Sequence, residues 1–452
     1  MPEHHSLGRP LHSTSGGKRK LTVQPPPPSP TPTPEHHSNL GKTALHPLHV
    51  ARGATMVPFG NFAMPLQYPD LSLSASHAWT REKCSLFDVS HMVQYTLSGP
   101  GAQDFLETLT PAGLRELEVG ASGLSVFLHE GTGGIVDDCL ITRLRALGEE
   151  QHRFYVVGNA GCRAKDWDFL STAMGKWERD GKPAVQLQHL QDEKDEAYGL
   201  LALQGPLAAS VLQSVLAPSC KVDMKTWYFG RSHPITLSLP FGTSLPILAS
   251  RGGYTGEDGF ELSVPASQTL AVAEHLLQHA GADRLRLAGL GARDSLRLEA
   301  GMCLYGHDID DNTTPVEGGL GWVVARSRRG NSTPAHGRPS FNGADVILPQ
   351  LLLRSRGGTG VKRKRVGLIV SGPPAREGAE VVDAEGQVIG KVTSGCPSPT
   401  LGVNVAMAYV PAKYQKSGTE VGVLVRGKKR KGVVSKMPFV GAKYFKEGAM
   451  PG

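Results

Sequence analysis

Two adjacent acids, Asp137 and Asp138, lie in a run that is otherwise typical of a buried β-strand, residues 133–142 (GGIVDDCLIT). Neighbouring strand residues point to opposite faces of a sheet, so if one face is core, water cannot reach both carboxylates. A carboxylate held away from water is unfavourable unless it is paired with a positive charge or needed for function. The two adjacent acids are therefore a candidate chemical centre. The alternative is a solvated strand end with both acids exposed, and the pattern alone leaves both interpretations open.

The length and composition predict a multidomain globular protein. A chain of 452 residues is too long for one ordinary core and predicts about two or three domains. It contains no stretch of about 18 uninterrupted apolar residues, so we expect no membrane insertion. The six cysteines form no CxxC pair, which argues against a zinc site and a disulfide framework and fits a reducing compartment.

The chain changes character along its length. Residues 1–45 are rich in Pro, Ser, His and Lys, cannot form a core, and are expected to be a disordered basic tail. Such a tail is compatible with a mitochondrial transit peptide, although its proline block suits an amphipathic helix poorly. Residues 46–326 mix strand and helix patterns and predict an α+β body. Residues 327–365 read as a linker and barrel entry, and the short strands of residues 366–445 predict a small β-barrel.

The formal charge of +7 comes partly from the tail and from basic runs at residues 362–365 and 428–431. Such runs most often lie on solvated strand ends or loops, and no aromatic residues are interleaved with them, so we expect no nucleic-acid binding. The sequence also lacks GxGxxG, HExxH and GxSxG motifs, which removes the usual support for a nicotinamide cofactor, a zinc protease or a serine hydrolase. Residues 422–429 nearly fit a phosphate-loop motif, but the segment ends in Lys where the motif has Ser or Thr, and its interior is typical of a strand. We therefore do not expect a phosphate loop here.

Glu261 follows a glycine-dense turn, residues 252–259 (GGYTGEDG), and lies in an alternating strand whose apolar side chains share the opposite face. If the Glu261 face is open to water, the residue is inert surface. If that face lines a cavity, the carboxylate can accept paired hydrogen bonds from an amino-substituted heterocycle.

Residues 290–301 predict a helix that carries two arginines. Arg297 has Asp294 three residues before it and can pair within the helix, whereas Arg293 has no acid at helical spacing. Arg293 is therefore the arginine available to a ligand, unless it is only a solubilising surface residue.

Three further residues are singled out by their positions. Asn159 follows the strand at residues 154–157 and is expected to cap the helix that begins at Ala160. Trp322 and Tyr444 lie beside glycine-rich backbone and could stack on a flat ligand, with core packing as the default for each.

Eight segments, in order along nearly the whole chain outside the tail, closely resemble the aminomethyltransferase, or T-protein, family of the glycine cleavage system. They are residues 84–92 (CSLFDVSHM), 133–138 (GGIVDD), 203–206 (LQGP), 253–259 (GYTGEDG), 292–301 (ARDSLRLEAG), 313–317 (TTPVE), 392–399 (VTSGCPSP) and 435–439 (SKMPF).

The resemblance implies a three-lobed α+β fold around a central hole that holds tetrahydrofolate, with two lobes in the body and a small β-barrel as the C-terminal lobe. It implies transfer of the methylene of the aminomethyl group on the dihydrolipoyl arm of H-protein to tetrahydrofolate, with release of ammonia. The implied partners are lipoylated H-protein and tetrahydrofolate, without a metal or nucleotide cofactor, in the mitochondrial matrix. A hypothesis that follows is that the basic runs at 362–365 and 428–431 meet an acidic carrier protein.

By its motifs the resemblance implies that Asp138 is the catalytic acid, and alternation then turns Asp137 away as a structural or solvated partner. The implied ligand contacts are Glu261, Arg293 and Tyr444, with Met92, Val157 and Trp322 as further folate-lining positions.

The chain departs from the family pattern at Asn61-Phe62, where Gly-Trp is expected, and in longer Gly/Arg-rich segments at 327–339 and 354–360. Two rival hypotheses share the fold. A folate-dependent demethylase would need a flavin domain that this sequence lacks. A folate-binding accessory protein of iron-sulfur assembly would carry Lys-Gly-Cys-Tyr-x-Gly-Gln-Glu where this chain has residues 251–258 (RGGYTGED).

Overall fold

The computed structural model describes residues 39–190, 197–329 and 340–448. Residues 1–38 of the predicted tail lie outside this range. Residues 40–45, which the composition assigned to the tail, belong to the fold: the Leu45 side chain is fully buried, and the Thr43 hydroxyl donates to Asp88 Oδ2 at 2.6 Å.

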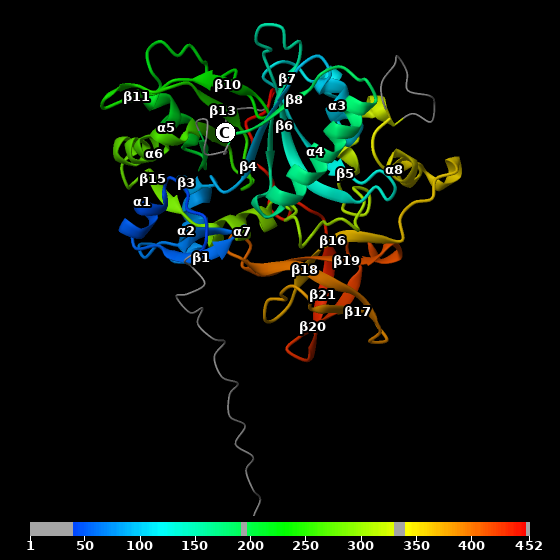
Figure 1. Cartoon of the computed structure of the whole chain (residues 1–452). Helices are drawn as coiled ribbons and strands as arrows, with labels where there is room; N and C mark the ends of the chain where they lie inside the picture. Colours follow the sequence, from blue (N-terminus) through cyan, green and yellow to red (C-terminus); the bar gives the residue numbers. More distant parts are fainter. Residues whose placement is uncertain (1–38, 191–196, 330–339, 449–452) are drawn as a thin grey trace, which may run out of the picture. The chain divides into compact units, whose positions relative to one another are not determined.

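The body contains a five-stranded antiparallel sheet in the order β5-β6-β7-β4-β8. Its strands are β4 (Val93–Ser98), β5 (Ser122–Leu128), β6 (Ile135–Leu144), β7 (Arg153–Gly158) and β8 (Gln186–His189). Helices α3 (Ala102–Leu109) and α4 (Arg163–Arg179) pack their apolar faces, including Phe105 and Leu170, against one side of this sheet (Figure 1).

A second sheet of six strands has the order β10-β13-β14-β9-β3-β15, with only β15 and β3 parallel among them. Its strands are β3 (Cys84–Asp88), β9 (Tyr198–Gln204), β10 (Ser232–Ile235), β13 (Ile247–Arg251), β14 (Gly259–Pro265) and β15 (Leu285–Ala288). Helices α5 (Ala208–Val215) and α6 (Ala266–Ala280) share a buried core with Phe260, Leu262 and Val264 of β14.

The opposite faces of the two sheets meet in a separate buried cluster. Tyr155 and Val157 of β7 pack there with Leu200 and Ala202 of β9 and with α7 (Leu290–Glu299). Gln94 of β4 joins the sheets, because its Oε1 accepts hydrogen bonds from Tyr155 at 2.7 Å and from Ser263 of β14 at 2.6 Å. The side of β14 that carries Glu261 therefore faces the first sheet.

The C-terminal part is a closed six-stranded barrel in the order β16-β19-β18-β17-β20-β21. Its strands are β16 (Arg363–Val370), β17 (Glu380–Val382), β18 (Val388–Ser398), β19 (Val403–Pro411), β20 (Glu420–Val425) and β21 (Lys428–Ser435). The predicted fold class, an α+β body followed by a small β-barrel, is confirmed.

The other α-helices and strands lie before, between or within these units. They are α1 (His46–Ala51), β1 (Thr55–Phe59), β2 (Phe62–Gln67), α2 (Leu73–Glu82), β11 (Ser238–Leu239), β12 (Gly242–Thr243) and α8 (Ala344–Leu351). No helix in the described parts of the chain is long and apolar enough to cross a membrane.

The segment expected to be a linker is partly structured. Ile347 of α8 is fully buried in a cluster with Val126 and Ile135 of the first sheet. Pro349 lies inside this short helix, so packing against the body, rather than helix propensity, stabilises it.

Asn61, part of the departure from the family pattern, lies with Gly60 in the turn between β1 and β2, at φ values of 66° and 54°. Two left-handed residues in a two-residue hairpin turn suit Gly and Asn. Arg163 lies over the ring of Phe62, with 5.4 Å from Cζ to the ring centroid.

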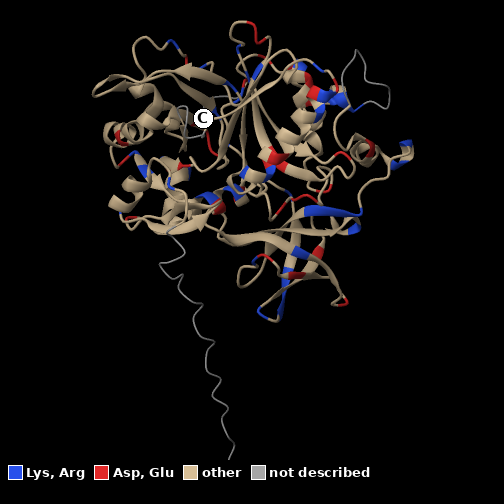
Figure 2. Cartoon of the chain, in the orientation of Figure 1, with Lys and Arg blue, Asp and Glu red and all other residues tan. Residues whose placement is uncertain are grey.

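The two basic runs differ in their surroundings (Figure 2). Arg365 is buried and donates to Gly318 O at 2.8 Å, and Arg363 donates to Asn312 O at 2.9 Å. The run at 362–365 therefore attaches β16 to the body instead of lying on a solvated strand end as expected. Lys428 and Lys429 are exposed at the start of β21.

Candidate active site

Asp137 and Asp138 lie on β6 between β5 and β7 and point to opposite faces of the first sheet, as alternation predicts. Asp137 is fully buried on the α4 side, where its neighbour two residues on is Cys139 of the helix-covered core. Asp138 is partly exposed on the other side, next to Leu140, which packs on the cluster between the two sheets. Asp137 is thus not solvated, and both acids are held in positions that disfavour charge.

Asn159, at the end of β7, joins the two acids. Its backbone N–H donates to Asp137 Oδ2 at 2.8 Å, and its side-chain Nδ2 donates to Asp137 Oδ1 at 2.9 Å and to Asp138 Oδ1 at 2.8 Å. The expectation that Asn159 caps the following helix is wrong, because its side chain makes no capping hydrogen bond and that helix starts with a short 3-10 turn.

The environment brings the titration of Asp138 near neutrality. Burial and the neighbouring Asp137 carboxylate raise the pKa of Asp138 to about 7, against the opposing effect of the Asn159 hydrogen bond. Burial also raises the pKa of Asp137. A carboxylate with a pKa near 7 is suited to accept a proton or to face a developing positive charge.

The charges of Glu261 and Arg293 act on each other near the cluster between the sheets. Burial raises the pKa of Glu261, and the positive charge of Arg293 opposes this rise. Burial lowers the pKa of Arg293, with the Glu261 charge again opposing the shift. The Nη1 atom of Arg293 is buried and has no hydrogen-bond partner among the described residues. An unpaired guanidinium nitrogen in a buried site is what a ligand acceptor would satisfy.

Tyr254 contacts Arg293 and lies within electrostatic range of Asp138. Arg293 Cζ lies 5.0 Å from the centroid of the Tyr254 ring. Burial is the main cause of the raised pKa of Tyr254, and the Asp138 charge adds to it. The Tyr254 hydroxyl donates to Cys303 O. Sequence reasoning missed this residue, although an aromatic ring inside the glycine-dense turn at 252–259 was a signal that could have found it.

Tyr444 lies against the same turn. The backbone N–H of Lys443 donates to Gly256 O at 2.8 Å, and the ring of Tyr444 stacks on Phe229 with centroids 4.1 Å apart. Burial raises the pKa of Tyr444 to about 12, and its buried hydroxyl has no partner within the described parts of the chain.

The three further folate-lining candidates differ in position. Val157 is buried in the cluster between the sheets, and Met92 packs against it from the loop before β4. Trp322 is 60% exposed and lines a separate cavity of about 240 Å³ with Leu124 and Ile141. In the described residues no hydrogen bond, ion pair or ring contact joins Trp322 to the other predicted site residues.

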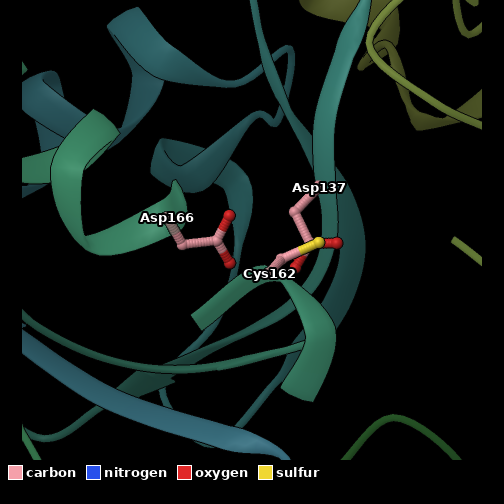
Figure 3. A group of neighbouring side chains, drawn as sticks. All are labelled: Asp137, Cys162 and Asp166. Carbon is pink, nitrogen blue, oxygen red and sulfur yellow. The ribbon is translucent and has the colours of Figure 1, made fainter. Parts of the chain in front are cut away.

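Behind Asp137, on the α4 side, lie Cys162 and Asp166 (Figure 3). One ligand-type atom from each of Asp137, Cys162 and Asp166 lies within 4.8 Å of the other two, and all three residues are buried. Burial raises the pKa of each of the three groups. Metals bind the deprotonated forms of these side chains, so a metal ion here would compete with the protons on Cys162 and Asp166.

Comparison with known proteins matches both parts of the chain. The family described as the GCVT N-terminal domain matches residues 45–328, and the family described as the glycine cleavage T-protein C-terminal barrel domain matches residues 363–441.

Named relatives are similar over nearly their whole length. A Schizosaccharomyces pombe protein named probable aminomethyltransferase, mitochondrial, is 43% identical over 409 residues, covering 90% of this chain and 95% of that protein. The Mus musculus protein named aminomethyltransferase, mitochondrial, is 44% identical over 406 residues, covering 90% of this chain and 91% of that protein. The crystal structure of glycine cleavage system aminomethyltransferase T from Bartonella henselae has a TM-score of 0.76 and 37% identity, covering 90% of this chain and 100% of that one.

Proposed function

Because the chain belongs to the glycine cleavage T-protein family of aminomethyltransferases, we propose that Asp138 is the carboxylate that acts in its reaction. The family resemblance expected from the sequence is confirmed. The chain is a tetrahydrofolate-dependent aminomethyltransferase of the glycine cleavage system. The observation that supports the role of Asp138 is its partly exposed carboxylate, fixed by Asn159 and with a pKa near neutrality.

Tetrahydrofolate, when bound, supplies the amine that receives the methylene group. The Asp138 carboxylate stabilises the positive charge that builds up beside it as ammonia leaves, because a fixed charge in a poorly solvated site acts more strongly than in water. With a pKa of about 7 it can also accept a proton from an attacking amine. Asn159 holds the carboxylate in one orientation through Nδ2.

Three residues offer polar groups that fit a folate. Glu261 presents carboxylate oxygens for the amino edge of a pterin, while Arg293 Nη1 and Tyr444 Oη are buried polar atoms without partners in the described chain. Met92 and Val157 add apolar surface in the cluster between the two sheets. Trp322 contributes to this binding only if the ligand extends to its separate cavity.

The family works with H-protein, and we propose that the loaded partner is H-protein whose lipoyl arm carries the aminomethyl group. We propose that the protein acts in the mitochondrial matrix, and the mitochondrial names of the relatives support the organelle. Because Arg363 and Arg365 are bound to the body, the exposed residues at 428–431 remain the candidates for contact with an acidic carrier.

The test is turnover by Asp138→Asn with aminomethyl-loaded H-protein. We expect roughly a 100-fold or greater fall in kcat with tetrahydrofolate affinity retained, since the lost charge acts mainly in the transition state. The wild-type rate should fall as pH drops below about 7, where Asp138 is protonated, and the variant should lack this dependence. Asp168→Asn, which removes an exposed charge from α4, is the matched control.

Full turnover by Asp138→Asn would refute the role of that residue. A wild-type protein that binds tetrahydrofolate but releases no ammonia from loaded H-protein would instead favour the folate-binding accessory hypothesis.

A further inference from the structure

Asp166, in the first turn of α4, is a fully buried acid that the proposed reaction does not use. Its carboxylate points toward Asp137 (Figure 3). Neither Asp166 Oδ1 nor Oδ2 receives a hydrogen bond from a donor in the described parts of the chain. A buried carboxylate with no donor is unfavourable, so its charge state and its contacts need an explanation.

The geometry of Gly158 shows how closely the two acids converge. A Cβ atom at this position of β7 would lie 3.1 Å from Asp166 Oδ2 and 3.2 Å from Asp137 Oδ2. One oxygen of each carboxylate therefore lies close to the same point above a residue that has no side chain, and a carboxylate oxygen of Asp166 lies within 4.8 Å of one of Asp137.

Two carboxylates in such contact, without a cation between them, cannot both ionise, so together they hold at least one proton. Asp137 accepts two hydrogen bonds from Asn159, at 2.8 and 2.9 Å, and these favour its ionised form. Asp166 has no such donors, which assigns the proton to Asp166. Burial and the Asp137 charge accordingly raise the pKa of Asp166 to about 10.

We propose that Asp166 is a positioning residue for the aminomethyl transfer: its protonated carboxyl donates a hydrogen bond to Asp137, Asp137 fixes Asn159, and Asn159 holds the Asp138 carboxylate. This role rests on the proposed function of Asp138. The proton stays on Asp166 throughout, so the chain of contacts orients Asp138 without transferring a proton to it.

Other titratable groups face Asp166 from every packed element. They are Tyr95 on β4, Asp137, Asp138 and Cys139 on β6, Cys162 before α4, and Lys165 on α4. Lys165 is the cation among them, but its Nζ donates to Asp311 Oδ2 at 3.0 Å, on the partly exposed side of the helix. Lys165 therefore does not neutralise the Asp137 and Asp166 carboxylates in place of the proton on Asp166.

The experiment compares two substitutions in the full chain. Asp166→Leu removes the donor, and we expect kcat to fall roughly 10- to 100-fold, because small displacements of a catalytic group have effects of this size, while tetrahydrofolate affinity is kept. Asp166→Asn stays neutral and can still donate to Asp137, so it should recover most of the rate lost in Asp166→Leu. Asp168→Asn controls for a charge change on the same helix.

Two readouts report the proton itself. A carbonyl infrared band of a protonated carboxyl group should be present near pH 8 in the wild type and lost in Asp166→Asn. Stability should respond as well: a carboxyl whose pKa is raised on folding destabilises the native state as pH rises between its unfolded and folded values. Asp166→Asn should therefore gain stability relative to the wild type between about pH 5 and pH 9.

Each outcome separates this role from the proposed function. Slow turnover by Asp138→Asn together with normal turnover by Asp166→Leu would overturn the positioning role alone, whereas normal turnover by Asp138→Asn would overturn the function of Asp138. If Asp166→Leu does not fold, the turnover and the infrared spectrum of Asp166→Asn test the role instead. A protonated-carboxyl band that is the same in Asp166→Asn as in the wild type would overturn the role. One equivalent of bound metal in the purified protein would also overturn it.

Discussion

At the scale of single residues, Glu261 and Arg293 give the site two opposite charges that act on each other in a poorly solvated space. We expect Glu261→Gln to weaken tetrahydrofolate binding roughly 10- to 100-fold, since a hydrogen bond to a charged group contributes about 1.5–3 kcal/mol. Equilibrium titration with tetrahydrofolate measures this. Glu274→Gln, an exposed change on α6, is the control, and equal affinities of the two variants would contradict a contact between Glu261 and the ligand.

Sequence alone separated the faces of Asp137 and Asp138 because a strand has a fixed period of two. It also paired Arg297 with Asp294, whose atoms lie 2.8 Å apart, because helix spacing is fixed. It could not find the Asn159 bridge or the contact with Asp166, which bring together residues from β6, β7 and α4. Such contacts depend on how elements pack, and no local pattern encodes them.

At the scale of elements, β7 ends in a glycine, and two carboxylates lie in the space that a side chain there would enter. We expect Gly158→Ala to reduce the free energy of unfolding by about 1–3 kcal/mol, the usual effect of overpacking, and to slow turnover by displacing Asp137. Gly161→Ala, where a new Cβ meets nothing within 4 Å, is the matched control three residues away. Denaturant unfolding compares the two, and equal stabilities would show that the carboxylates can move aside.

Strand β14 and helix α7 are elements that the sequence pattern predicted. Strand β21, whose first half is a basic run, and helix α8, which contains Pro349, were not predicted. Each is stabilised by neighbours that are distant in sequence, since β21 pairs with both β16 and β20 to close the barrel and α8 is packed through Ile347. Tertiary pairing outweighs local propensity in both.

At the scale of the whole chain, part of the positive charge lies at internal contacts instead of on the surface. Arg297 of α7 is buried between Asp308 Oδ2 at 2.6 Å and the Ser394 hydroxyl of β18 at 2.9 Å. Asp308 also accepts hydrogen bonds from Thr393 and Ser394 of the barrel, at 2.5 and 2.9 Å. This network links the helix that carries Arg293 to the barrel, so the stability of the body and the barrel should be coupled.

Asp308→Asn tests that coupling. Removing one partner of a buried ion pair leaves an uncompensated charge, and we expect the free energy of unfolding to fall by about 3–5 kcal/mol. Asp294, the other acid bound to Arg297, has a side chain that is 51% exposed. The substitution Asp294→Asn should therefore lower the free energy of unfolding by only about 0–1 kcal/mol. Chemical unfolding monitored by tryptophan fluorescence distinguishes the two. A small, equal effect of both substitutions would mean that water replaces the buried pair and that the barrel is held to the body by apolar packing instead.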